Sequence, residues 1–270
     1  MLSSRKKIGL ALGSGGAKGL AHIGVIKYLV ENNIPIDYIA GASAGALIGG
    51  MYAATKDIYG IEKLAKEFNY FDFLNIFTDI SLSKGLVRGN KAIEYLKKHI
   101  GPMKIEDLKI PFQAVATDII TAKTIILDSG ELIKAIRASG SIPGLFKPVH
   151  YEDYYLVDGG TSMPVPVKIV RQMGADIVIA VNLDFVYFSP KHRKNSLNIA
   201  QILEQSVNLL RYHLADENVK DADIVIKPDI PPVRLTAVVK GEKLIKAGEI
   251  AAQEALAGLK GELICNTFKN

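Results

Sequence analysis

The residues best suited to chemistry lie in the sequence Gly-Ala-Ser-Ala-Gly at positions 41–45. In serine hydrolases the spacing Gly-x-Ser-x-Gly places the serine on a sharp turn between a strand and a helix. Residues 34–40 are mainly apolar and favour a strand, and the small apolar residues 44–54 favour a helix. Side chains at Gly41 and Gly45 would collide with the backbone in such a turn. The pattern predicts Ser43 as a nucleophile; the alternative for this motif alone is a closely packed helix start.

A glycine-rich loop, Gly-Ser-Gly-Gly-Ala-Lys-Gly at residues 13–19, joins a short apolar strand at residues 8–12 to a helix. Such a loop favours negative charge through its N–H groups and the helix N-terminus. A dinucleotide fingerprint would need a third glycine in place of Lys18, and a P-loop would need Ser or Thr in place of Gly19. An oxyanion needs only N–H donors near a nucleophile. Both turns would lie on the same edge of a parallel sheet, so we expect an oxyanion hole formed by Gly13, Ser14, Gly15 and Gly16.

A third stretch, Asp158-Gly159-Gly160, follows the apolar strand expected at residues 154–157. An aspartate at a strand end, followed by two glycines, has a carboxylate that can reach across the sheet edge. The alternative is an ordinary Asx turn, which Asp-Gly forms readily.

A serine hydroxyl needs a base before it becomes a strong nucleophile. Of the five histidines, His22 and His150 are the alternatives that could complete a triad, but neither sits on a glycine turn after a strand. A loop lysine such as Lys18 is normally charged at neutral pH. Asp158 is the remaining candidate, and it becomes a useful base if partial burial raises its pKa.

Together these stretches resemble the patatin-like phospholipase family, most closely its small bacterial members that resemble the catalytic domain of neuropathy target esterase. The resemblance covers most of the chain. Residues 9–25, including Lys18 and Gly19, resemble the family's oxyanion block, and residues 41–45 resemble its elbow. Residues 135–139 with 141–144 resemble its middle block, and residues 158–160 its Asp-Gly-Gly. Four blocks in the family's order make the resemblance specific.

The resemblance implies a Ser–Asp dyad without histidine, in which Ser43 is the nucleophile, Asp158 the base, and the Gly15 and Gly16 amides the oxyanion donors. Two residues depart from the family's pattern. Ser14 replaces a common glycine and would be strained if that position needs a positive φ. Lys147 stands where a proline is common, which would reshape the wall of the substrate pocket.

The rest of the chain supplies the elements that must position these residues. Its 270 residues are 49% hydrophobic and 23% charged, which is a globular composition. Strand and helix patterns alternate, so we expect an α/β fold. We expect one domain over residues 1–270, and the resemblance implies a three-layer α/β/α arrangement with a mainly parallel sheet. The uncharged residues 38–55 are long enough for a membrane span, but their strand and glycine-rich turn argue against one.

The remaining composition limits cofactors, partners and location. No Asp, Glu or His cluster has metal-ligand spacing, so we expect neither metal nor cofactor. The basic residues behind the net charge of +5 are spread along the chain. This favours a solvated surface first, peripheral membrane contact second and nucleic-acid binding a distant third, so we expect no nucleic-acid partner. The N-terminus does not resemble a signal peptide, and a single cysteine fits a reducing compartment. We therefore expect a cytoplasmic protein, peripheral to the membrane if it contacts one; the sequence does not predict its oligomeric state.

Residues 56–77 predict a helix with crowded aromatic side chains. These side chains suit a core or pocket wall, and the alternative is a lid over an apolar acyl site. Together with the serine and glycine motifs, the family resemblance implies an acyl-ester hydrolase of lipids, of the phospholipase A or lysophospholipase type. The alternatives are an esterase with a Ser–His pair and a non-catalytic module that binds lipid or phosphate.

Overall fold

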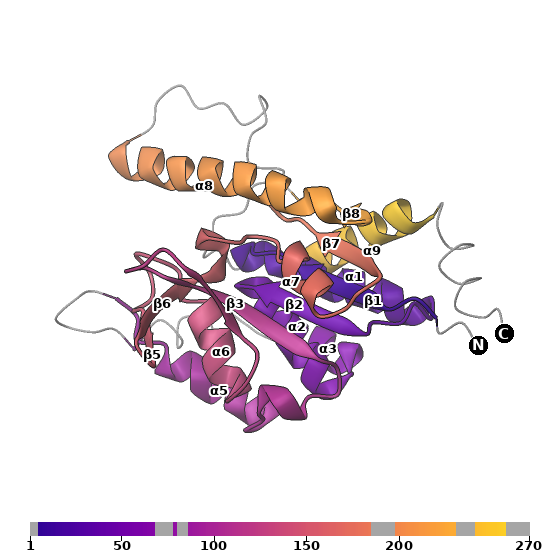
Figure 1. The fold of residues 1–270 in the computed structure, drawn as a ribbon, viewed down its shortest axis with the longest axis horizontal. Helices are drawn as coiled ribbons and strands as arrows, with labels where there is room; N and C mark the ends of the chain where they lie inside the picture. Colours follow the sequence, from indigo (N-terminus) through magenta and orange to yellow (C-terminus); the bar gives the residue numbers. More distant parts are fainter. Residues whose placement is uncertain (1–4, 68–77, 80–85, 185–197, 231–240, 258–270) are drawn as a thin grey trace.

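A computed structural model describes residues 5–67, 78–79, 86–184, 198–230 and 241–257. Within these residues, eight strands form one sheet in the order β5-β6-β3-β2-β1-β7-β8, with β4 paired to β3 (Figure 1). The strands are β1 (Ile8–Leu12), β2 (Tyr38–Ala42), β3 (Phe112–Asp118), β4 (Thr124–Leu127), β5 (Val149–Tyr151), β6 (Tyr154–Asp158), β7 (Ile177–Val181) and β8 (Ile224–Ile226).

The centre of the sheet is parallel. β1 pairs in parallel with β2 and β7, β2 with β3, and β7 with β8. The antiparallel pairs lie at one side, where β3 pairs with β4 and β6, and β6 pairs with β5. The expected α/β fold with a mainly parallel sheet is confirmed.

Helices cover both faces of the sheet because successive side chains of its central strands are apolar on both sides. Leu10 and Leu12 of β1 belong to the larger core, beneath α1, α2, α3, α5, α6 and α9. Ala11 faces the smaller core, beneath α7 and α8. The helices are α1 (Ala21–Glu31), α2 (Ala44–Thr55), α3 (Ile58–Glu67), α5 (Asn90–Ile100), α6 (Leu132–Ser139), α7 (Val167–Gln172), α8 (Ile199–Asn218) and α9 (Gly241–Leu256).

Strand β3 brings the ends of two other strands together. β2 pairs with its first half, ending where Ala42 meets Val115. β6 runs the opposite way and ends where Asp158 meets Ala116. Because β4 occupies the opposite edge of β3 at these same residues, β2 and β6 share one edge and meet end to end.

The structure differs from the predicted elements at three places. The strand expected over residues 34–40 begins only at Tyr38, because Pro35 has no N–H and the Asp37 carboxylate accepts the Ile8 N–H instead. The sequence does not predict the short strand β5, because its three residues form a strand only through their pairing with β6. The helix expected over residues 56–77 is α3 up to Glu67, and residues 68–77, with most of the aromatic side chains, lie outside the described residues.

The uncharged stretch over residues 38–55 forms β2, the serine turn and α2. In the parts of the chain that the structure describes, none of the helices combines the length and apolar character of a membrane span.

Candidate active site

Ser43 lies on a strained turn between β2 and α2. Its backbone has φ 54° and ψ −117°, a conformation that costs energy and is typical of residues held for a function. A Cβ added at Gly41 would lie 2.4 Å from the carbonyl of Gly45, and one at Gly45 would lie 2.1 Å from the Leu12 oxygen. The strand–turn–helix context and the need for both glycines are as the motif predicts.

The Ser43 hydroxyl contacts the Asp158 carboxylate directly. Ser43 Oγ donates a hydrogen bond of 2.5 Å to Asp158 Oδ2, and both residues are 7% exposed. The other carboxylate oxygen, Oδ1, accepts the Gly160 N–H at 2.8 Å. Asp158 caps the short 3-10 helix of residues 159–161 through this bond. Both oxygens of the carboxylate are therefore held in place, and one of them faces the Ser43 hydroxyl.

Burial raises the pKa of Asp158, because a carboxylate loses its hydration there. The positive charge of Arg211 opposes this rise, as do the hydrogen bonds from Ser43 and Gly160. The charge of Asp184 adds to it. A raised pKa makes Asp158 a stronger base than an exposed aspartate.

The expected oxyanion loop lies beside this pair, but two of its N–H groups are occupied. Gly13 donates its N–H to Val181 O at 3.0 Å, and Ser14 donates its N–H to Pro164 O at 2.8 Å. The Gly15 and Gly16 N–H groups have no acceptor within the described ranges. We expected all four residues to donate an N–H group to an oxyanion. Because Gly13 and Ser14 already use theirs, the expected donors are reduced to Gly15 and Gly16. Ser14 is absent from the positive-φ residues of the described chain, so it carries no such strain.

Ser139 is a site residue that sequence reasoning did not single out. The Ser43 N–H donates to Ser139 Oγ at 2.8 Å, and Ser139 Oγ donates to Val115 O at 2.6 Å. The Ser43 N–H is thus used to anchor the turn. The signal was present, because Ser139 closes the middle block of the resemblance, but its role depends on a fold that brings α6 beneath the turn.

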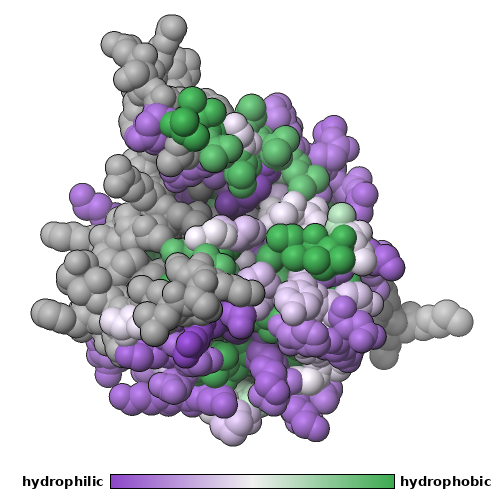
Figure 2. Space-filling model, turned by 90° about the vertical axis from the view of Figure 1, so that its left-hand side faces the viewer, coloured by the Kyte–Doolittle hydropathy of each residue, from purple (hydrophilic) through white to green (hydrophobic). Residues whose placement is uncertain are grey.

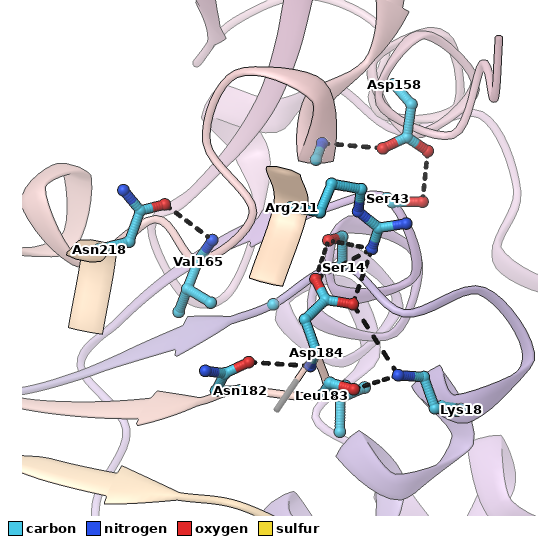
Figure 3. Close-up of polar contacts among 12 residues, drawn as sticks. Ser14, Lys18, Ser43, Asp158, Val165, Asn182, Leu183, Asp184, Arg211 and Asn218 are labelled. Carbon is cyan, nitrogen blue, oxygen red and sulfur yellow. Dashed lines mark hydrogen bonds and ion pairs between the residues drawn. The ribbon is translucent and has the colours of Figure 1, made fainter. Parts of the chain in front are cut away.

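Lys18 belongs to a buried charged cluster at the end of β7 (Figure 3). Its ammonium group donates to Leu183 O and lies 3.8 Å from Asp184 Oδ1. Desolvation lowers the pKa of Lys18 to about 8. Asp184 also pairs with Arg211 of α8 at 3.0 Å. Sequence reasoning missed Asp184 and Arg211; the only signal was that Asp184 follows a buried parallel strand, where sites form.

Neither histidine alternative contacts Ser43 Oγ, which donates to Asp158. His22 is fully buried and its Nε2 hydrogen-bonds Gly13 O at 2.7 Å. Burial lowers the pKa of His22 to about 4. His150 is exposed on β5, with its ring edge-on to Tyr155. The bond from His22 to Gly13 O therefore supports the glycine loop, and His150 has no part in the site.

Arg137 holds the segment that carries Lys147. Its Nη1 donates to Ser141 Oγ at 2.5 Å, and its Nη2 donates to Arg88 O at 2.8 Å and to Lys147 O at 3.0 Å. The guanidinium also lies 4.9 Å from the centre of the Phe146 ring. The bonds to Ser141 and Lys147 hold the segment after α6, and the bond at Lys147 uses its backbone carbonyl, which any residue type supplies. As for metals, the described residues contain no group of three or more His, Cys, Asp or Glu side chains that could bind one.

Comparison with known proteins gives one consistent result. The sequence model of the family described as patatin-like phospholipase matches residues 10–171. An NTE family protein of Mycobacterium tuberculosis is 40% identical over 182 residues, which are 67% of this chain and 50% of the relative. A lysophospholipase of Neurospora crassa is 35% identical over 181 residues, 66% of this chain and 12% of that protein. The chain thus corresponds to half the length of its mycobacterial relative.

Among solved structures, VipD from Legionella pneumophila has a similar fold, with a TM-score of 0.51 at 14% identity. The match covers 94% of this chain and 67% of that chain.

Proposed function

The chain belongs to the patatin-like phospholipase family, and from that membership we propose that it hydrolyses acyl esters of lipids with Ser43 and Asp158 as a catalytic dyad. The observation that carries the proposal is the direct hydrogen bond of 2.5 Å from Ser43 Oγ to Asp158 Oδ2. It is supported by the strained backbone of Ser43 and by the raised pKa of Asp158.

In the first half of the reaction, Ser43 Oγ attacks the ester carbonyl while its proton passes to Asp158 Oδ2. The Gly15 and Gly16 N–H groups stabilise the resulting oxyanion, and removing such donors typically costs on the order of 100-fold or more in rate. The intermediate collapses to an acyl-Ser43, and Asp158 returns the proton to the departing alcohol. In the second half, water attacks the acyl group, gives its proton through Asp158 to Ser43, and releases the fatty acid.

Phospholipid or lysophospholipid is the proposed substrate class. The name of the Neurospora relative supports it, as does a hydrophobic surface on α8. Ile199, Ile202, Leu203, Val207 and Leu210 are between 49% and 78% exposed along one side of the helix, and Glu204 is the only charged residue from 199 to 210. Figure 2 shows hydrophobic side chains gathered on the face where α8 begins. A helix surface of this kind suits the interface of a lipid bilayer.

The experiment compares hydrolysis of a p-nitrophenyl acyl-ester series by the wild type, Ser43→Ala, Asp158→Asn and His22→Gln, each checked for folding. We expect the first two variants to lose activity and His22→Gln to retain it. Activity in Asp158→Asn would favour a different base. Failure of the folded wild type to react with a serine-directed phosphonate would favour a non-catalytic binding module.

A second arm tests the lipid surface by sedimentation with phosphatidylcholine–phosphatidylglycerol vesicles. We expect Leu203→Glu to reduce vesicle binding while leaving hydrolysis of a soluble ester unchanged. Gln205→Glu adds the same charge to α8 outside the hydrophobic surface and serves as the matched control. Equal vesicle binding by the two variants would contradict the lipid-surface proposal without touching the dyad.

A further inference from the structure

One basic residue of α8 points toward the candidate active site. Arg211 is the only lysine or arginine in the helix. It lies one turn before Ala215, which is fully buried in the smaller core, so it projects from the side of α8 that faces the sheet. Its side chain is 15% exposed. The position is costly for a cation unless its contacts compensate for lost hydration.

Those contacts join three distant parts of the chain. Arg211 Nη2 donates to Ser14 Oγ at 2.8 Å and lies 3.0 Å from both oxygens of Asp184. Ser14 Oγ also donates to Asp184 Oδ2, at 3.3 Å. Asp184 in turn is 3.8 Å from the Lys18 ammonium. The guanidinium therefore links α8 to the oxyanion loop and to the end of β7.

The same network lies against the dyad. A Cβ at Gly160 would be 2.7 Å from Ser14 Oγ and 3.0 Å from Asp158 Oδ1. Gly160 thus lies beside both the Ser14 hydroxyl and the Asp158 carboxylate, and a side chain at this position would press on both. Figure 3 shows the Arg211 guanidinium between the Ser43–Asp158 pair on one side and Asp184 on the other.

From this geometry we infer that Arg211 is a positioning residue: it fixes the oxyanion loop through Ser14 and places a positive charge beside the Ser43–Asp158 pair. The inference rests on the proposed function, because it assigns Arg211 to the dyad and the loop that the reaction uses. Ser14, which departs from the family's glycine, acquires a role here: its hydroxyl is the loop's contact with α8.

The charges around Asp158 give the inference a signature that a purely structural residue would lack. Arg211 lowers the pKa of Asp158, and Asp184 raises it. Lys18, the other charged residue of this cluster, pairs with Asp184, while His22 is neutral above about pH 4 and hydrogen-bonds Gly13 O. Removing the positive charge and removing the negative charge should therefore shift the pH profile in opposite directions.

The test measures kcat and kcat/KM for a soluble ester from pH 4 to 9 in the wild type, Arg211→Gln, Arg211→Lys and Asp184→Asn. In Arg211→Gln we expect kcat to fall at least 10-fold and the acidic limb of the profile to move up by about 1 pH unit, the lower range for an arginine near a carboxylate. In Arg211→Lys the limb should stay near its wild-type position while kcat falls. In Asp184→Asn the limb should move down.

Arg171→Met is the matched control, because it breaks another Arg–Asp pair, with Asp223, at the opposite edge of the sheet. It should lower stability at most and leave the pH profile unchanged. An acidic limb that stays in place in Arg211→Gln and in Asp184→Asn would overturn the inference, even if both variants were less stable. Should Arg211→Gln fail to fold, Arg211→Lys and Asp184→Asn still decide the matter. Activity that survives Ser43→Ala would instead overturn the proposed function.

Discussion

Replacing Gly45 by alanine should disable the site through one misplaced methyl group. The new Cβ would lie 2.1 Å from Leu12 O, 2.5 Å from Leu12 C and 2.8 Å from Gly13 O. These atoms belong to the end of β1 and the start of the oxyanion loop. A Cβ does not approach other heavy atoms within 3.0 Å, so α2 must move away from the loop by about 1 Å.

The size of the effect follows from where this displacement falls. It separates the helix that begins beside Ser43, the proposed nucleophile, from the loop that carries the proposed oxyanion donors. A misplacement of about 1 Å can cost on the order of 100-fold in rate. The strain should cost about 1–3 kcal/mol of stability, partly offset by about 1 kcal/mol from the better helix propensity of alanine. Gly45→Ala should therefore fold and lose at least ~100-fold in kcat/KM.

Gly50→Ala provides the control in the same helix. There the added Cβ would meet only side-chain atoms of Ile136, Leu132 and Phe112, at 3.1, 3.2 and 3.3 Å. Small side-chain adjustments can relieve such contacts, so its kcat/KM should remain within about 3-fold of the wild type. The assay is p-nitrophenyl ester hydrolysis, with urea unfolding to establish that both variants are folded. Equal activity of the two folded variants would refute the steric account of the serine turn.

Two further substitutions test the support of the site. His22 has a pKa of about 4 in the fold against about 6.5 when exposed, so the unfolded chain binds more protons between these values and stability is lost as pH falls. From pH 7 to 4.5 this loss should be about 2 kcal/mol; His22→Gln should lack it, and urea unfolding of both proteins at the two pH values measures the difference. Ser139→Ala leaves the Ser43 N–H and Val115 O without their shared hydroxyl, which should lower the free energy of unfolding by about 1–3 kcal/mol and lower kcat at least 10-fold. Ser129→Ala, at an exposed serine, is its control. Equal kcat values for these two variants would contradict the anchoring role of Ser139.

The features that the sequence predicts correctly depend on residues that lie close together in the chain. The serine turn is one example, because Gly41 and Gly45 make the strand-to-helix turn possible within a few residues of Ser43. The parallel centre of the sheet is another, since the short apolar run at residues 8–12 forms the buried strand β1, which pairs in parallel with β2 and β7. Such local patterns leave few alternatives, and the fold agrees with them.

What the sequence could not predict depends on contacts between distant residues. The N–H groups of Gly13 and Ser14 looked equivalent to those of the next two residues, but Val181 O and Pro164 O accept them. Arg211 lies 197 residues from Ser14 in a helix whose pattern does not reveal which side faces the sheet. The lid over residues 56–77 stays a prediction, because the described helix ends at Glu67.

The absence of a histidine between Ser43 and Asp158 follows from how β3 pairs with its neighbours. Ala42, just before the serine, is opposite Val115, and Asp158 is opposite Ala116, so the two strand ends are registered to consecutive residues of β3. A slip of one residue in either pairing would move its side chain by about 3.3 Å along the strand and turn it to the other face of the sheet. The 2.5 Å hydrogen bond from Ser43 Oγ to Asp158 Oδ2 leaves no room for an imidazole. The sheet itself thus fixes the distance that an intervening histidine would otherwise have to span.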